Sequence, residues 1–481
     1  MVNERLSSLD ASFLYLETPA VHMHVAGVSV FDPLEDGPLS YDDVQRVVES
    51  RLHLAPRLRQ RVLRVPFGLT RPLWVDDDRF DLDFHLRRAA IPSPGGRFQL
   101  ERAVGRVLSR PLDPGKPLWE LYVFEGLAER RTAVLMKLHH ALADGISGMT
   151  IASALFDLAP DADLGAPRPW KAEASPTPED LMRDVARDLV LHPLEAVGHA
   201  LGAPARSFQA VAETLSGVRD VVDMGAPPAG PFDTTIGPAR RFATAEASFA
   251  RIREIKRALG GTVNDVVLTA VAGGLHDLLE HRGEHTRGRT LRVMVPVSVR
   301  SKAEHGDVGN RVAPAFVDVP IGTLRARTRL HRVRRATAEL KGSSMAVGAD
   351  SIIGLGAYAP PALHAMAARL TSRGRWFNLV VSNVPAPQVP LYLAGAPLVA
   401  SYPSMPLGER SGLSIACTSL AGTMAFGLTA DWDSVPDVEV LARGIESAID
   451  ELEKAAAAAP TRASAPHRPT PGPPRASRPP R

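Results

Sequence analysis

The 481-residue chain has only one cysteine, Cys417, and it therefore cannot form an intramolecular disulfide. Such sparing use of cysteine is typical of a reducing compartment. A cysteine nucleophile needs a nearby base or cation that lowers its pKa, and the segment Ile415–Thr418 offers neither. We therefore predict that Cys417 is a packed core residue.

Long apolar runs are also missing. The stretch closest to a membrane span, Ser351–Leu363, is short and is broken by Pro360 and Pro361, so it cannot cross a bilayer. Met1–Glu17 lacks the basic region and apolar core of a secretory signal. These absences lead us to expect a cytoplasmic protein.

Charge and motif content exclude further classes. The net charge is only +3, and the last stretch alone carries five arginines and no acid, so the basicity belongs to the tail. That tail has no interleaved aromatic residues, which argues against nucleic-acid binding. The chain shows no glycine-rich phosphate loop, no dinucleotide-binding fingerprint and no Gly-x-Ser-x-Gly nucleophile motif.

What the chain does have is a pair of adjacent histidines at the end of an apolar strand. His139 and His140 follow the alternating segment Arg131–Leu138, and Asp144 and Gly145 come directly after them. A neutral imidazole is well suited to removing a proton from a hydroxyl group. Because consecutive strand residues face opposite sides, we expect one histidine to reach a cavity and the other to pack inside.

Two other interpretations of the pair remain open. A histidine pair at a strand end can be purely structural. His140 and Asp144 would share a helical face and could bind a metal, but no second cluster supplies the remaining ligands that zinc needs. We therefore predict no metal and no cofactor.

The pattern His-His-x-x-x-Asp-Gly resembles the signature of coenzyme A-dependent acyltransferases built like chloramphenicol acetyltransferase and the peptide-synthetase condensation domains. Further blocks, in the same order, resemble the bacterial wax ester synthase/diacylglycerol acyltransferases. They are Leu6–Leu14, Pro111–Glu120 with Pro117-Leu118-Trp119, Gly261–Val267 with Asn264-Asp265, Val295–Arg300 followed by Gly309-Asn310, Ser382–Pro385 and Pro390–Gly395. The chain departs from the family pattern at Val21–Val25, which reads Val-His-Met-His-Val where relatives usually have Pro-Met-His-Val, and at Ala386, where they tend to have glycine.

The resemblance implies an α+β fold of two chloramphenicol-acetyltransferase-like, condensation-type domains, each a two-layer α/β sandwich, with the active site in an interdomain tunnel. The length also favours two domains. We expect an N-terminal domain over 1–175, a helical crossover over 176–238, a C-terminal domain over 239–455 and a disordered Pro/Arg-rich tail over 456–481.

Local patterns predict several elements. His24–Phe31 has the pattern of a strand, and Ser40 marks the start of a helix. In the second half we expect strands over Leu291–Val297, Phe377–Ser382 and Thr423–Thr429, helices over Ile252–Leu259 and Val263–Leu279, and a closing helix over Val438–Ala456. Pro178–Val222 has helical periodicity and forms the expected crossover.

The resemblance also implies roles for these residues. His140 is the expected general base and His139 supports it, while Asp144 braces the loop by pairing with an arginine and Gly145 permits the turn. Arg300 is our candidate partner for Asp144, with Arg292 and Arg311 as alternatives. Asn264 and Asp265 either begin a helix or also support the wall of the site. Pro117, Leu118 and Trp119 are expected to pack rather than to react.

The implied reaction is direct transfer of a fatty acyl group from acyl-CoA to diacylglycerol or a long-chain alcohol, giving triacylglycerol or wax ester. Such substrates partition into lipid, so reversible contact with a membrane or lipid-droplet surface is expected. Two alternatives stay open at this point. One is a condensation-fold acyltransferase for another hydroxyl or amine, such as a complex-lipid or polyketide ester. The other is a non-catalytic lipid-binding relative.

Overall fold

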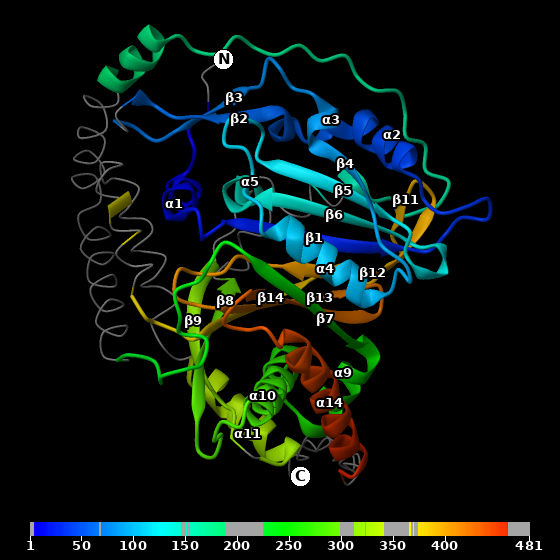
Figure 1. Ribbon diagram of the computed structural model, residues 1–481, viewed down its shortest axis with the longest axis vertical. Helices are drawn as coiled ribbons and strands as arrows, with labels where there is room; N and C mark the ends of the chain where they lie inside the picture. Colours follow the sequence, from blue (N-terminus) through cyan, green and yellow to red (C-terminus); the bar gives the residue numbers. More distant parts are fainter. Residues whose placement is uncertain are drawn as a thin grey trace, which may run out of the picture.

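The computed structural model describes residues 4–66, 69–145, 151, 154–187, 225–298, 312–322, 324–340, 365–366, 369 and 374–459. Arg300, Gly309, Asn310 and Arg311 lie outside these ranges, and so do most of the predicted crossover and the tail from residue 460. Within the described part the chain forms two six-stranded sheets and a two-stranded ribbon of β2 (Gln60–Leu63) and β3 (Leu73–Asp76). The two large sheets lie one above the other (Figure 1).

The first sheet carries the histidine motif. Its strand order is β11-β12-β1-β6-β5-β4, and all neighbours are antiparallel except β4 and β5. The strands are β1 (His24–Phe31), β4 (Leu86–Ala90), β5 (Trp119–Glu125), β6 (Thr132–His139), β11 (Tyr392–Leu393) and β12 (Ala396–Ser404). The structure therefore gives β1 the bounds that the sequence predicts.

Helices cover both faces of this sheet. On one face α2 (Tyr41–Arg51) buries Val44, Val47 and Val48, and a capping box between Ser40 and Asp43 begins it. On the other face α4 (Arg97–Leu108) packs against strand residues of β1, β5 and β6. The short α1 (Ser8–Leu16) and α3 (Leu82–His85) complete the described helices before the motif. Helix α4 also contacts the strand at residues 240–248, so it lies between the first sheet and part of the second domain.

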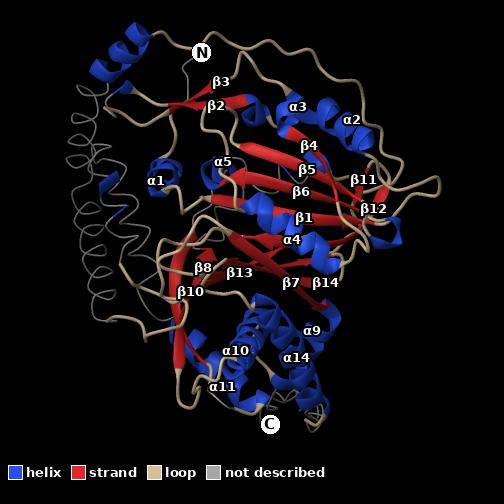
Figure 2. Ribbon diagram, in the orientation of Figure 1, coloured by secondary structure: helices blue, strands red, loops and turns tan. Residues whose placement is uncertain are grey.

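The second sheet has helices on the side away from the first domain (Figure 2). Its strand order is β7-β14-β13-β10-β8-β9. The strands are β7 (Arg240–Ser248), β8 (Thr290–Ser298), β9 (Val312–Pro320), β10 (Leu379–Pro385), β13 (Leu413–Leu420) and β14 (Thr423–Asp431). The helices are α9 (Phe249–Leu259), α10 (Val263–His281), α11 (Ala326–Leu340) and α14 (Val438–Ala457). This arrangement confirms the predicted α+β fold with two sheet-containing domains.

The core of the second domain includes Cys417 of β13, as the sequence predicts. Complete burial raises the pKa of its thiol far above the ordinary value, so the group stays protonated and unreactive.

Two strands from the second half of the chain belong to the first sheet. Strands β11 and β12 come from residues 392–404, inside the range expected for the C-terminal domain, yet they extend the first sheet beside β1. The C-terminal range is therefore shared between the two sheets. The pairing of β12 with β1 joins segments that are far apart in the chain, and local sequence patterns do not reveal such pairing.

Several hydrogen bonds join the domains, and two sets of them lie between the sheets. The Oγ1 and main-chain N–H of Thr244 in β7 both donate to the Glu101 carboxylate of α4, at 2.7 Å each. Ser404 of β12 and Thr429 of β14 share a hydrogen bond of 2.8 Å between their hydroxyl groups. The two sheets consequently meet along α4 and β12.

No single helix in the described ranges is long and apolar enough to cross a membrane, although α9 and α10, bent by 101°, pass that test as a pair. Residues 178–187 are helical, in agreement with the start of the predicted crossover.

Candidate active site

The two histidines of the motif stand where a strand turns into a helix. β6 ends at His139, and α5 (His140–Gly145) begins with His140. The N–H of His139 donates to the Leu118 carbonyl at 2.9 Å, and the N–H of His140 donates to the Met23 carbonyl at 2.7 Å. The backbone of the pair is thereby fixed between the Pro-Leu-Trp block and the segment that precedes β1.

His139 caps the helix that His140 begins. Its ring Nδ1 accepts the N–H of Ala141 at 3.1 Å, which satisfies one of the free amide groups at the helix start. Because Nδ1 accepts, the neutral ring carries its proton on Nε2. That nitrogen lies 3.6 Å from Oε2 of Glu17. His139 is fully buried, so its imidazole is an internal structural group.

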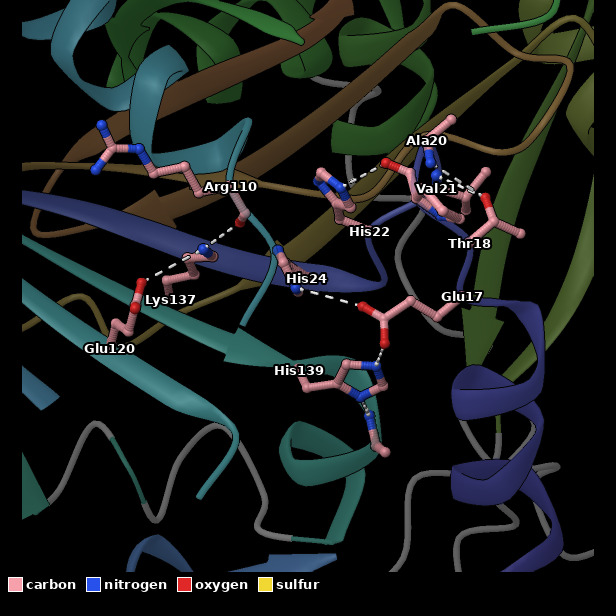
Figure 3. Close-up of polar contacts among 12 residues, drawn as sticks. Glu17, Thr18, Ala20, Val21, His22, His24, Arg110, Glu120, Lys137 and His139 are labelled. Atoms are coloured by element: carbon pink, nitrogen blue, oxygen red, sulfur yellow. Dashed lines mark hydrogen bonds and ion pairs between the residues drawn. The ribbon is translucent and has the colours of Figure 1, made fainter. Parts of the chain in front are cut away.

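Glu17 links His139 to a second buried histidine. Its other oxygen, Oε1, lies 3.6 Å from Nε2 of His24, and Figure 3 shows the carboxylate between the two rings. Burial raises the pKa of Glu17, but the interactions with His139 and His24 outweigh it, and the pKa lies well below the ordinary value. Glu17 is therefore a carboxylate at neutral pH.

His24 is neutral at neutral pH. Burial lowers its pKa to about 3, although Glu17 opposes that shift. Its ring stacks near His22 with a centroid separation of 5.4 Å, and burial lowers the pKa of His22 as well. Glu17 was not anticipated as part of the site. The pairing of His24 with His139 across β1 and β6 places them together, and only the strand register reveals it.

His140 has a different environment. Its side chain is half-buried, and its ring stacks on Phe13 of α1 with centroids 3.9 Å apart and planes inclined by 25°. Since His139 points into the interior and His140 lies at the helix start, the two rings do not share a direction. His140 is the motif histidine with access to solvent.

The Pro-Leu-Trp block lies directly beside the pair. Trp119 is 1% exposed, stacks on His85 at 4.5 Å and donates its Nε1 proton to the Leu58 carbonyl at 2.7 Å. A cavity of about 10 Å³, enough for about one water molecule, lies among residues that include Leu118, Glu17 and His139. Trp119 thus occupies a packing position next to the histidines and is too buried to meet a substrate.

Asn264 and Asp265 lie in the second domain and share no described contact with the histidines. The N-cap of α10 is Thr262 rather than Asn264, because Thr262 completes a capping box with Asp265. Asp265 also accepts the Thr337 hydroxyl of α11 at 2.6 Å. These bonds join α10 to α11, which is a supporting arrangement within the second domain.

Asp144 and Gly145 continue α5, and the structure describes their backbone only. The proposed partner Arg300 lies outside the described ranges. Arg292, an alternative partner, has Asp318 at 2.9 Å from its Nε. No group of three or more potential metal ligands occurs among the described residues.

Comparison with known proteins decides the family. Residues 6–267 match the wax ester synthase/diacylglycerol acyltransferase catalytic domain, and residues 308–453 match the C-terminal domain of the same family. The chain belongs to this family.

Relatives of the wax ester synthase/diacylglycerol acyltransferase family extend over nearly the whole chain. A protein of Mycobacterium tuberculosis named a putative diacylglycerol O-acyltransferase is 33% identical over 459 residues, covering 93% of this chain and 90% of the relative. The wax ester synthase/diacylglycerol acyltransferase of Marinobacter aquaeolei VT8 superposes with a TM-score of 0.67 and 28% identity, covering 94% of this chain and all of that one.

More distant similarity extends to the condensation fold. The starter condensation domain of rhizomide synthetase, solved in complex with C8-CoA and Leu-SNAC, gives a TM-score of 0.54 at 12% identity over 95% of each chain. At that identity the likeness concerns the fold alone. Membership of the wax ester synthase/diacylglycerol acyltransferase family makes this chain an acyltransferase.

Proposed function

We propose that the protein transfers a fatty acyl group directly from acyl-CoA to the hydroxyl group of diacylglycerol, a long-chain alcohol or both, with His140 as general base. The observation that carries the proposal is the division of labour between the two histidines. His139 is buried and caps α5, whereas His140 is half-buried at the start of that helix. The names of the relatives support the choice of acceptors.

The proposed reaction needs no covalent enzyme intermediate. His140 accepts the hydroxyl proton as the alcohol oxygen attacks the thioester carbonyl. The tetrahedral intermediate collapses, the carbon–sulfur bond breaks, and the imidazolium returns the proton to the departing CoA thiolate. General-base assistance of this kind contributes about 10²–10⁴-fold to the rate.

The surroundings of the base serve to hold it in position. We infer that Glu17 fixes His139, and that His139 in turn fixes the first turn of α5 and with it His140. Asp144, paired with Arg300, would brace the other end of that helix, and the substrates would meet in a tunnel between the domains. At neutral pH Glu17 is charged and His24 is neutral in this scheme.

The proposed setting follows from the substrates. Diacylglycerol and long-chain alcohols reside in lipid, while acyl-CoA is dissolved in water. A cytoplasmic protein that contacts a membrane or lipid-droplet surface reversibly would have access to both.

The test is thiol release from palmitoyl-CoA by the purified protein, supplied with diacylglycerol or with hexadecanol. We expect thiol only when an acceptor is present, a matching amount of ester, and a loss of at least about 100-fold in His140→Ala. His281→Ala, at an exposed position at the end of α10, is the control. Binding of acyl-CoA without acylation of either alcohol would contradict the proposed acceptors. Full activity in a folded His140→Ala variant would contradict the role of the base.

A further inference from the structure

A cleft with a strongly basic lining opens where the two domains meet. It has a volume of about 290 Å³ and is lined by Arg106, Ser109, Arg110, Ala239, Arg240 and Trp432. We call it the arginine cleft. The first three residues come from the end of α4 and the turn after it. Ala239 and Arg240 lie at the start of β7, and Trp432 directly follows β14. The N–H of Arg240 donates to the Ser109 hydroxyl at 2.8 Å, which joins the two walls.

Two of the three arginines that line the cleft lack an acidic partner in the described part of the chain, whereas Arg240 lies beside Asp431. Arg106 and Arg110 are exposed, and neither has a carboxylate at ion-pair distance within the described ranges. Arg240 is 3% exposed, and its guanidinium donates to carbonyl oxygens of Gly237, Ala239 and Ala20. Two exposed arginines, Arg106 and Arg110, therefore line the cleft without a carboxylate partner among the described residues.

The same cleft offers an aromatic surface. Trp432 is 42% exposed, and the guanidinium of Arg241 covers one face of its ring at 3.9 Å from the centroid. Trp432 lines the cleft, whereas Arg241 does not. Unpaired arginines recognise phosphate groups, and exposed aromatic rings stack on nucleobases. The combination fits a purine nucleotide that carries phosphate.

Two hydrogen bonds connect the arginine cleft to the catalytic centre. Arg240 reaches the carbonyl of Ala20, which lies in the segment between Glu17 and His24. Lys137, two residues before His139 on β6, donates from Nζ to the carbonyl of Arg110 at 2.6 Å. Figure 3 shows Arg110, Lys137, His24 and His139 in one neighbourhood. A ligand in the cleft would thus lie outside the catalytic centre but beside it.

We propose that the arginine cleft binds the phosphoadenosine end of acyl-CoA, with the phosphates at Arg106 and Arg110 and the adenine at Trp432. This proposal rests on the proposed use of acyl-CoA. In CoA a long pantetheine arm separates the nucleotide from the thioester, so a nucleotide site must lie at a distance from the base. The cleft volume suits a nucleotide, since sites for whole drug-sized ligands start at about 300 Å³.

A binding measurement tests the site without any turnover. We would titrate adenosine 3′,5′-bisphosphate into the full-length protein by calorimetry. The double variant Arg106→Gln/Arg110→Gln should bind at least tenfold more weakly, because each charge-assisted bond is lost. Arg102→Gln is the matched control, since Arg102 lies one turn earlier on α4, is equally exposed and does not line the cleft. Equal binding by the double variant and the wild type overturns the proposal.

A kinetic measurement connects the site to the reaction. The ratio of kcat/KM for palmitoyl-CoA to kcat/KM for palmitoyl-pantetheine, which lacks the nucleotide, should fall at least tenfold in the double variant and in Trp432→Leu. It should stay unchanged in Arg102→Gln. A proportional loss with both donors overturns the assignment, because the cleft would then act on something other than the nucleotide.

A lipid headgroup is the other source of phosphate, and a third measurement separates it. If the double variant loses binding to phosphatidylserine/phosphatidylcholine vesicles and retains nucleotide binding, the cleft is a lipid site and the proposal is overturned. If the wild type binds the bisphosphate but acylates neither alcohol, the proposed acceptors fail while the nucleotide site stands.

Discussion

At the scale of single residues, His139 and His140 have the same chemistry but different tasks. Position 139 needs an acceptor for the Ala141 N–H and a donor toward Glu17. Asparagine can supply the first through its side-chain oxygen, as it does at many helix N-caps, whereas leucine supplies neither. We expect His139→Leu to lower the free energy of unfolding by about 1 kcal/mol more than His139→Asn.

Urea unfolding of the two variants checks this expectation, and kcat measured on the same preparations shows whether the cap also positions His140. We expect the leucine variant to be the slower enzyme. Equal stability and equal kcat in the two variants would show that the cap has no influence on the site.

Glu17 is the second residue whose role the structure defines. Glutamine retains the shape of the side chain but removes the charge that faces the Nε2 atoms of His24 and His139. By comparison with other groups that orient a reacting residue from behind, we expect Glu17→Gln to lower kcat by roughly 10–100-fold. The KM for acyl-CoA should change little, because Glu17 acts through His139.

The pH profile distinguishes positioning from general damage to the fold. In Glu17→Gln the acid limb of the kcat profile should shift to lower pH, because the negative charge that favours a protonated histidine nearby is gone. Glu35→Gln, on an exposed turn, is the control and should retain the wild-type profile. An unshifted acid limb in Glu17→Gln would argue that the carboxylate does not influence the base.

At the scale of elements, the strand β12 holds the two sheets together. Pro403 of β12 pairs with Gly27 of β1 on one side, and its carbonyl approaches Gly427 of β14 on the other. A Cβ atom on Gly427 would lie only 1.7 Å from the Pro403 oxygen, whereas a Cβ atom on Gly27 would have no atom within 4 Å. The two glycines thus make a matched pair around one proline.

Alanine at each position gives opposite expectations. Gly427→Ala requires a backbone shift at the junction of the sheets and should lower the free energy of unfolding by about 3 kcal/mol, the upper end for overpacking. Gly27→Ala should stay within about 0.5 kcal/mol of the wild type, as is usual away from tight contacts. Thermal or urea unfolding decides the matter, and similar losses in both variants would mean that β12 tolerates displacement.

At the scale of the whole molecule, the sequence predicts the features that depend on near neighbours better than those that depend on long-range pairing. The strand at His24–Phe31 and the helix after Ser40 follow from alternation and capping, which depend on near neighbours. The motif histidines stand out because His-His-x-x-x-Asp-Gly is local too. Glu17 has no such signature, and its role depends on the register of β1 against β6. The addition of β11 and β12 to the first sheet depends on pairing between residues such as Phe31 and Leu398, which are 367 positions apart, so no local window of sequence contains it.

The buried titratable groups give the whole molecule a stability that depends on pH. Burial lowers the pKa of His24 from 6.5 to about 3 and also lowers those of His22 and His85. A histidine whose pKa is lower in the folded state than in the unfolded state binds its proton more readily after unfolding. The stability it contributes is therefore complete above pH 6.5 and is lost as the pH falls toward the folded value. Glu17 adds a loss below about pH 4.5, since its pKa is also lower in the folded protein.

We therefore expect the free energy of unfolding to be flat near pH 8 and to fall below pH 6.5. Each such histidine should contribute a slope of about 1.4 kcal/mol per pH unit. In His24→Gln the buried titratable group is absent, so the slope between pH 6.5 and 4 should be shallower by about that amount, whatever the variant has lost at pH 8. Urea unfolding at several pH values measures both slopes. The same slope in the variant and the wild type would show that His24 takes up no extra proton on unfolding, and would place the acid sensitivity elsewhere in the histidine cluster.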